Sequence, residues 1–124
     1  MLENNKILLA TSNTGKLKEF RKMFSNFEIK SQGDLGIDEP IEDGLTFLEN
    51  ALIKARHGAD KSGMFSVADD SGIVVPGLNF APGIYSARYA GESASDLDNR
   101  NKIIEELNKL NVKSLPAYLS LIHI

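Results

Sequence analysis

The sequence predicts an α/β fold, because short apolar runs alternate with segments of helical periodicity. Helical periodicity marks three segments, at residues 14–25, 46–61 and 95–111. Strand-like runs lie before and between them, at residues 6–11, 27–30, 65–69 and 72–75. The length of 124 residues suits a single domain. We therefore expect one domain over residues 1–124, with helices flanking the strands.

The first strand and helix are marked by a change of period. Residues 6–11 are short, apolar and followed by turn-forming residues, which is typical of a buried strand. From residue 14 onward, Leu17, Phe20 and Phe24 recur on one helix face. Residues 27–30 alternate between apolar and polar side chains, which predicts a second, half-exposed strand.

A loop is predicted over residues 32–44, which carry three glycines and a proline. The second helix follows, and Thr46 and Glu49 have capping-box spacing at its start. Its expected buried stripe is Leu48, Ala51, Leu52, Ala55 and Ala59. We then expect two strands interrupted by a polar turn at residues 69–72.

The third helix has Ser95 as its expected N-cap. Its expected core face is Leu97, Ile103, Ile104, Leu107 and Leu110. Residues 117–124 have the pattern of a strand that begins and then stops. This ending predicts a truncated domain, in which residues 119–124 form a non-native tail.

Composition excludes several classes of protein. An apolar share of 42% and a charged share of 25% are typical of a folded globular protein. The absence of cysteine excludes disulfides and thiolate metal sites. A net charge of −3 argues against binding to a nucleic-acid polymer. The sequence shows no signal peptide and no membrane-spanning run, so we expect a cytoplasmic protein that does not bind membranes.

The polar turn after the first strand, at residues 11–16, is the main candidate for anion binding. It exposes backbone N–H groups at a helix N-terminus and adds a lysine. It does not match a P-loop, because Ala10 and Leu17 stand where that motif needs Gly and Ser or Thr. From spacing alone, a phosphate site and an ordinary turn with an exposed lysine are equally good interpretations.

Three acidic residues are candidates for metal binding or proton transfer. Asp69 and Asp70 follow an apolar run, where open α/β sheets place ligands. Adjacent side chains of a strand point to opposite faces, so these two carboxylates are not expected to share one metal symmetrically. Glu42 offers the oxygen ligand that Mg²⁺ prefers, although a solvated acidic loop is the alternative. Taken alone, Lys54 is interpreted as a surface lysine.

Four segments in this order resemble the inosine triphosphate pyrophosphatase family. They are Ala-Thr-Ser-Asn-Thr-Gly-Lys at 10–16, Gly-Leu-Thr-Phe-Leu-Glu-Asn-Ala at 44–51 with Lys-Ala-Arg at 54–56, Ala-Asp-Asp-Ser-Gly-Ile at 68–73, and Ala-Pro-Gly-Ile-Tyr-Ser-Ala-Arg-Tyr-Ala-Gly at 81–91. Any one of them could arise by chance, but the four in order are specific. They cover the chain from its start to the third helix.

The resemblance implies an elongated α/β domain with a long mixed β-sheet, Mg²⁺ dependence and a homodimer. It implies hydrolysis of ITP, dITP and XTP to the monophosphate and pyrophosphate. Its catalytic positions match Asp70, Lys54 and Asp69, and its metal-site acids match Glu42 and Asp70. Its substrate-binding positions match Thr11, Ser12, Asn13, Thr14, Gly15, Lys16 and Ser71.

The family continues beyond the matched segments with further strands and two C-terminal motifs, of Phe-Gly-Tyr-Asp and Ser-His-Arg type, that contact the base. This chain does not contain them, so we expect it to be the N-terminal portion of the family fold. Two alternatives remain at this stage. One is a Maf-type nucleotide pyrophosphatase, against which Asn13 and Lys16 argue; the other is a non-catalytic nucleotide-binding fragment.

Overall fold

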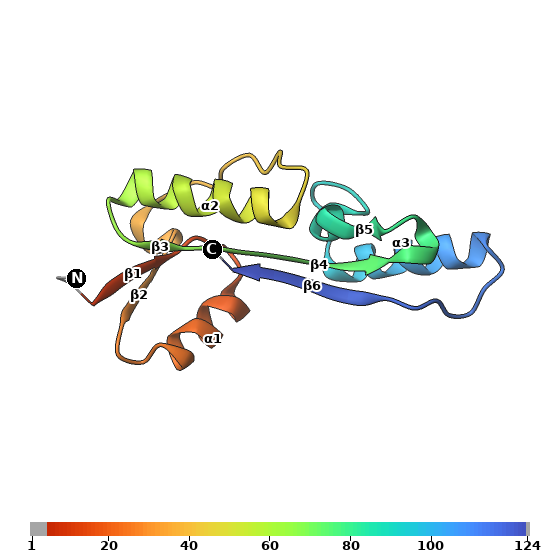
Figure 1. Cartoon of the computed structure of the whole chain (residues 1–124), viewed down its shortest axis with the longest axis horizontal. Coiled ribbons are helices and arrows are strands. Elements are labelled where there is room, and N and C mark those ends of the chain that lie inside the picture. Colours follow the sequence, from red (N-terminus) through yellow and green to blue (C-terminus); the bar gives the residue numbers. More distant parts are fainter. Residues whose placement is uncertain (1–4, 124) are drawn as a thin grey trace. The chain divides into compact units, whose positions relative to one another are not determined.

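The computed structural model describes residues 5–123. Within these residues the chain divides into two compact units, one reaching to Asp70 and including residues 122 and 123, the other spanning Ser71–Leu121. The predicted α/β class is confirmed, since helices alternate with strands in the chain (Figure 1). Among the described residues, no helix combines the length and apolar character that a membrane span requires.

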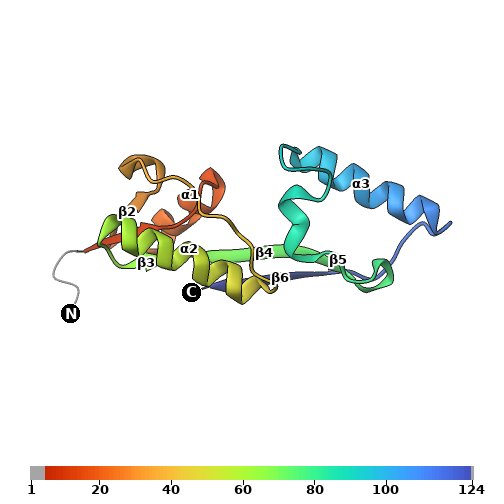
Figure 2. The same cartoon turned by 90° about the horizontal axis from the view of Figure 1, so that it is seen from above.

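The first unit is a parallel sheet between two helices. Its elements are β1 (Lys6–Leu9), α1 (Thr14–Met23), β2 (Glu28–Ser31), α2 (Phe47–Ser62) and β3 (Ser66–Val67). The strand order is β2-β1-β3, and β1 pairs in parallel with both neighbours. Helices α1 and α2 cover opposite faces of this sheet (Figures 1 and 2). The carboxyl ends of all three strands therefore meet at one edge.

Small residues allow α2 to approach the sheet closely. Leu8 and Ala10 of the first strand segment are fully buried, and Ala55 of α2 is 8% exposed. Gly58 faces the same strand, and a Cβ built there would lie 2.8 Å from Leu8 Cδ2 and 2.7 Å from Ser66 Oγ. The absence of a side chain at Gly58 therefore sets the distance between helix and sheet.

We expect Gly58→Ala to destabilise the protein despite the higher helix propensity of alanine. Overpacking a tight contact typically costs about 1–3 kcal/mol, which exceeds the roughly 1 kcal/mol that Ala gains over Gly in a helix. Urea denaturation followed by circular dichroism measures the difference. A variant more stable than the parent would show that the helix can shift away from the sheet freely.

The second unit contains a sheet with strand order β5-β4-β6. Its elements are β5 (Ala81–Pro82), α3 (Asp96–Lys109) and the greater part of β4 (Asp69–Val75) and of β6 (Tyr118–His123). Strands β4 and β5 pair antiparallel. Short 3₁₀ helices occupy Gly33–Leu35 in the first unit, and Pro76–Leu78 and Gly83–Arg88 in the second. Among residues 5–123 the strands form two three-stranded sheets, which together contain the parallel and antiparallel pairing expected of a mixed α/β fold.

Three local predictions differ from the structure. Leu48, expected in the buried stripe of α2, is 46% exposed. The polar stretch at residues 69–72 is not a turn but the start of β4, because pairing within the second sheet keeps its backbone extended. The expected core face of α3 is half exposed, with Leu97 at 56%, Ile104 at 52% and Leu110 at 51%. Among the described elements, α3 packs mainly against the 3₁₀ helix Gly83–Arg88, which covers only part of that face.

Other boundaries agree with the sequence. Thr46 caps α2, and its Oγ1 accepts a hydrogen bond from Glu49 N–H at 3.1 Å. Ser95 and Asp98 form a complete capping box at the start of α3. The strand predicted at the end of the chain is present as β6, and its last expected residue, Ile124, lies outside the described residues.

Candidate active site at the carboxyl edge of the parallel sheet

Predicted site residues gather where the parallel strands end. Thr11 lies two residues beyond β1, and Asp69 lies two residues beyond β3. Both are buried, at 9% and 2% exposure. In open parallel sheets this edge is where ligands bind, because the loops leave the sheet there and the helices begin.

The turn between β1 and α1 is built by its own side chains. Thr11 Oγ1 accepts a hydrogen bond from Asn13 N–H at 3.1 Å. Asn13 caps α1, and its Oδ1 accepts from Lys16 N–H at 3.1 Å. The N–H groups of Thr14 and Gly15 lie in the first helical turn, where no intrahelical acceptor exists. The predicted anion-binding turn is therefore a capped helix N-terminus.

Lys16 and Asp69 form a close ion pair, 2.7 Å between Nζ and Oδ2. The Asp69 side chain is 3% exposed and that of Lys16 is 26% exposed. The carboxylate thus holds the ammonium group against the end of the sheet. This pairing suits a positioning role for Asp69, since its side chain is directed to the lysine.

Lys54 lies between the two predicted metal-site acids. Its Nζ is 3.4 Å from Glu42 Oε1 and 3.5 Å from Asp70 Oδ1. The Lys54 side chain is 13% exposed, so it is not the surface lysine that spacing alone suggests. Asp69 and Asp70 contact different lysines, as the alternation of side chains along an extended strand requires.

The loop that carries Glu42 is fastened to α2 at two points. His57 Nε2 lies 2.8 Å from the carbonyl oxygen of Asp38. Asn50, 1% exposed, accepts a hydrogen bond from Gly44 N–H through its Oδ1 at 2.8 Å. The helix therefore holds the loop on either side of Glu42, and the position of this carboxylate follows from α2.

A cavity of about 80 Å³ joins these segments. Its walls come from the β1–α1 turn, the residue after β2, the acidic loop and α2, and they are Thr11, Ser12, Gln32, Glu39, Pro40, Glu42 and Lys54. Its volume exceeds the roughly 10–15 Å³ that one water molecule needs. Four predicted site residues, Thr11, Ser12, Glu42 and Lys54, thus line one space.

Burial raises the pKa of Asp70 above its ordinary value, and the nearby Glu42 carboxylate raises it further, while Lys54 opposes the shift. A carboxylate that is costly to ionise is a stronger base when it is ionised. Its Oδ2 is buried and has no hydrogen-bond partner in the part of the chain that the structure describes.

We expect Asp70→Asn to stabilise the metal-free protein at neutral pH. Because the pKa of Asp70 is raised by folding, the ionised form weakens the folded state above that pKa. Lowering the pH through the folded pKa protonates Asp70 and removes the penalty. The stability difference between variant and parent should therefore shrink as the pH falls to about 4. Urea denaturation with a chelator, between pH 4 and pH 7, measures it; a constant difference would contradict this account.

The carboxylates of the site fit a Mg²⁺ ion that takes only a few of its ligands from the protein. Among residues 5–123, no group of three or more His, Cys, Asp or Glu side chains is placed to hold a metal. Mg²⁺ commonly takes one or two carboxylates from the protein and completes its shell with phosphate and water. Glu42 and Asp70 supply two carboxylates, and the partnerless Asp70 Oδ2 is an available oxygen.

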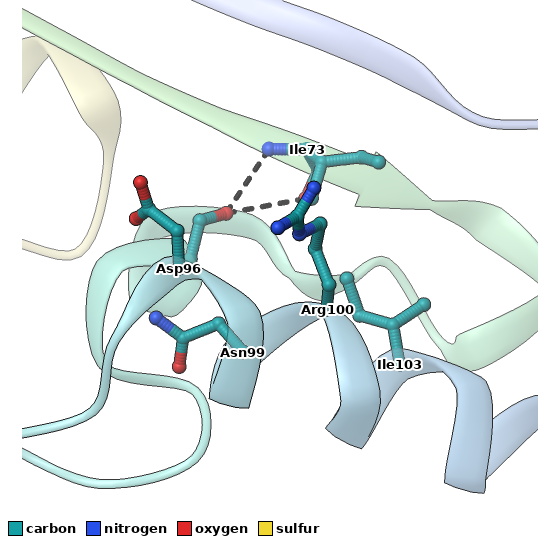
Figure 3. Close-up of a pocket in the computed structure, with 6 residues that line it drawn as sticks. Ile73, Asp96, Asn99, Arg100 and Ile103 are labelled. Atoms are coloured by element: carbon teal, nitrogen blue, oxygen red, sulfur yellow. Dashed lines mark hydrogen bonds between the residues drawn. The ribbon is translucent and has the colours of Figure 1, made fainter.

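A larger cavity, of about 360 Å³, lies in the second unit and is built differently (Figure 3). Ser86 Oγ accepts a hydrogen bond from Ile73 N–H at 3.0 Å and donates one to Gly83 C=O at 2.6 Å. Asn99 accepts from Ala90 N–H and donates to Ala87 C=O. These polar side chains hold backbone segments together, which indicates a structural role.

Sequence reasoning missed three side chains that shape the site. Asn50 and His57 fasten the acidic loop, and Gln32 lines the cavity. Gln32 follows β2 directly, so its place at the carboxyl end of a predicted strand was the available signal. Ser71, a predicted substrate contact, belongs to β4 at the start of the second unit, and its role stays a prediction.

The chain is similar to curated enzymes over most of its length. It is 58% identical over 104 residues to the dITP/XTP pyrophosphatase of Haemophilus influenzae, covering 82% of this chain and 53% of that protein. It is 57% identical over 106 residues to the dITP/XTP pyrophosphatase of Halorhodospira halophila, covering 84% and 53%. The chain thus spans about half the length of these relatives.

Solved structures and a family model agree with these relatives. A HAM1 protein from Coxiella burnetii matches with a TM-score of 0.83 and 38% identity, over 95% of this chain and 61% of that one. The Ham1 protein of Staphylococcus aureus matches with a TM-score of 0.80 and 37% identity, over the same shares. The model of the Ham1 family matches residues 7–120, and the chain therefore belongs to the Ham1 family.

Proposed function

We propose that this chain carries the phosphate-handling half of an enzyme that hydrolyses dITP, XTP and ITP to the nucleoside monophosphate and pyrophosphate. The observation that carries the proposal is the shared cavity, in which the anion-binding turn meets Lys54 and Glu42. Membership in the Ham1 family favours this activity over the Maf-type alternative. Removing these nucleotides from the cellular pool would be its role.

Glu42 and Asp70 would hold the Mg²⁺ ion in this proposal. Their carboxylates both approach Lys54, within 3.5 Å of its Nζ, so they lie around one point. When bound there, Mg²⁺ would neutralise charge on the triphosphate and on the leaving pyrophosphate.

Asp70 would act as the general base. It would accept a proton from a water molecule that attacks the α-phosphorus, and the bond to the bridging oxygen of pyrophosphate would break. Its pKa, raised by burial, brings it closer to the range in which a carboxylate accepts protons near neutral pH.

The two lysines would stabilise the negative charge of the substrate and of the transition state. Lys16 would contact the triphosphate beside the N-terminus of α1, and Asp69 would hold Lys16 in place. Lys54 would interact with the reacting phosphate and would offset the repulsion between the Glu42 and Asp70 carboxylates. Thr11 to Gly15 would provide the polar groups of the turn, and Ser71 a further contact.

The remaining predictions concern the whole protein. We propose one ITPase-like domain, of which this chain is the N-terminal portion, acting as a cytoplasmic homodimer without nucleic-acid polymer or membrane as a partner. The base would be selected by parts of the family fold that follow the segments matched here.

Pyrophosphate release tests the proposal. The chain is incubated with Mg²⁺ and with dITP, XTP, ITP, GTP or ATP in turn, and the products are identified by ³¹P NMR. We expect monophosphate and pyrophosphate in equal amounts. Binding of nucleotide without any product would favour the non-catalytic alternative and contradict the proposal.

A further inference from the structure

Gln32 is a buried polar residue with an unused donor. Its side chain follows β2 directly and is 3% exposed. Its Nε2 is buried and has no hydrogen-bond partner within residues 5–123. Buried polar groups in folded proteins are nearly always paired, so each exception calls for an explanation.

Gln32 lies at the third strand end of the same edge. Strands β2, β1 and β3 run in parallel, and register pairs Leu9 with Ser31 and with Val67. Gln32 is the first residue after β2 and Thr11 the second after β1, and both line the 80 Å³ cavity with Lys54 and Glu42. The backbone topology alone therefore brings Gln32 to the site.

The chemistry of the orphaned atom selects its ligand. A side-chain NH₂ group donates hydrogen bonds and cannot ligate a cation. Phosphate oxygens only accept them, and the adjoining turn is the predicted phosphate site. The cavity also contains the Glu39 and Glu42 carboxylates, which are acceptors, yet Nε2 is bonded to neither.

We propose that Gln32 is a substrate-binding residue whose Nε2 donates a hydrogen bond to a phosphoryl oxygen of the triphosphate held over the β1–α1 turn. This inference rests on the proposed function, since it deepens the same site. Because the amide is neutral, it holds one oxygen in place without adding to the charge that Lys16 and Lys54 provide. Because Nε2 makes no hydrogen bond to the described residues before the ligand binds, no such bond has to be broken, and the new hydrogen bond adds in full to the free energy of binding.

Calorimetric binding of inorganic triphosphate with Mg²⁺ tests the role, since this probe has no base. Gln32→Met keeps the length of the side chain and removes the donor. We expect its dissociation constant to rise at least tenfold, as hydrogen bonds to charged groups imply. The melting temperature should stay equal or rise, because an unpaired buried donor is gone. Gln32→Glu, which keeps the shape and adds negative charge, should bind at least as weakly as Gln32→Met.

Ser66→Ala is the matched control. Ser66 Oγ is also buried and has no hydrogen-bond partner among the described residues, but Ser66 lines a different cavity, beside the end of α2. We expect its affinity for triphosphate to equal that of the parent chain. A change as large as that of Gln32→Met would show that removing any orphaned atom disturbs binding, and would overturn the proposal.

Two outcomes separate this inference from the proposed function. If Lys16→Met weakens binding and Gln32→Met does not, the phosphate site stands and the role of Gln32 is overturned. If the parent chain binds no triphosphate, both are overturned. Weaker binding by both Gln32 variants, with a melting temperature of Gln32→Met equal to or above that of the parent, supports both.

Discussion

Replacing Asp70 with asparagine should lower the rate of pyrophosphate release from dITP by a factor of about 10²–10⁴, the usual contribution of a general base. The amide keeps the size of the side chain but cannot accept the proton of the attacking water. The substitution also replaces one of the two carboxylates proposed to hold Mg²⁺ with a neutral amide, which binds the ion more weakly. Because partial burial raises the pKa of Asp70, the loss of activity should accompany equal or higher stability in metal-free buffer.

Asp43→Asn is the control for this change. Asp43 is an exposed acid next to Glu42, and the substitution makes the same change of charge and shape close to the site. Its rate should stay near that of the parent. Equal rates for Asp70→Asn and the parent would remove Asp70 from the chemistry, whereas lower rates for both variants would point to a general effect of net charge.

Replacing Lys16 with methionine should lower the free energy of unfolding by about 3 kcal/mol, because it leaves a buried carboxylate without its partner. Asp69 is 3% exposed on its side chain, so water cannot replace the ammonium group. The 26% exposure of Lys16 places the expected loss at the lower end of the range for buried pairs. Triphosphate binding should weaken in the same variant.

A double-mutant cycle isolates the ion pair. Asp69→Asn removes the buried charge, so the combination of Lys16→Met and Asp69→Asn should recover part of the stability that Lys16→Met loses. Urea denaturation of the four proteins measures the coupling. Strictly additive losses would show that the 2.7 Å contact between Lys16 and Asp69 contributes nothing to stability.

The sequence predicted those parts of the fold that depend on local patterns. The apolar run at residues 7–10 and the change of period after it correctly place β1 and α1. Thr46 and Ser95 are N-caps as expected, because capping depends on side chains only three residues apart. The alternation along a strand also predicted that Asp69 and Asp70 would face different partners.

Contacts between distant segments account for what was missed. The polar residues 69–72 look like a turn, yet sheet pairing makes them the start of β4. Asn50 and His57 occur in a helix pattern that does not reveal the loop they fasten. Gln32 lies two residues beyond the strand predicted at residues 27–30, and only the parallel pairing of that strand with β1 shows that this end reaches the cavity. Lys54 illustrates the same point, since only the fold shows it between two carboxylates.

Hydrolysis in ¹⁸O-labelled water tests the central claim most directly, because the label marks the phosphorus that is attacked. With dITP as substrate, water activated by Asp70 at the α-phosphorus should place one ¹⁸O atom in the nucleoside monophosphate and none in pyrophosphate. Mass spectrometry of the two products measures this distribution. Label found in pyrophosphate, or release of orthophosphate, would contradict the account.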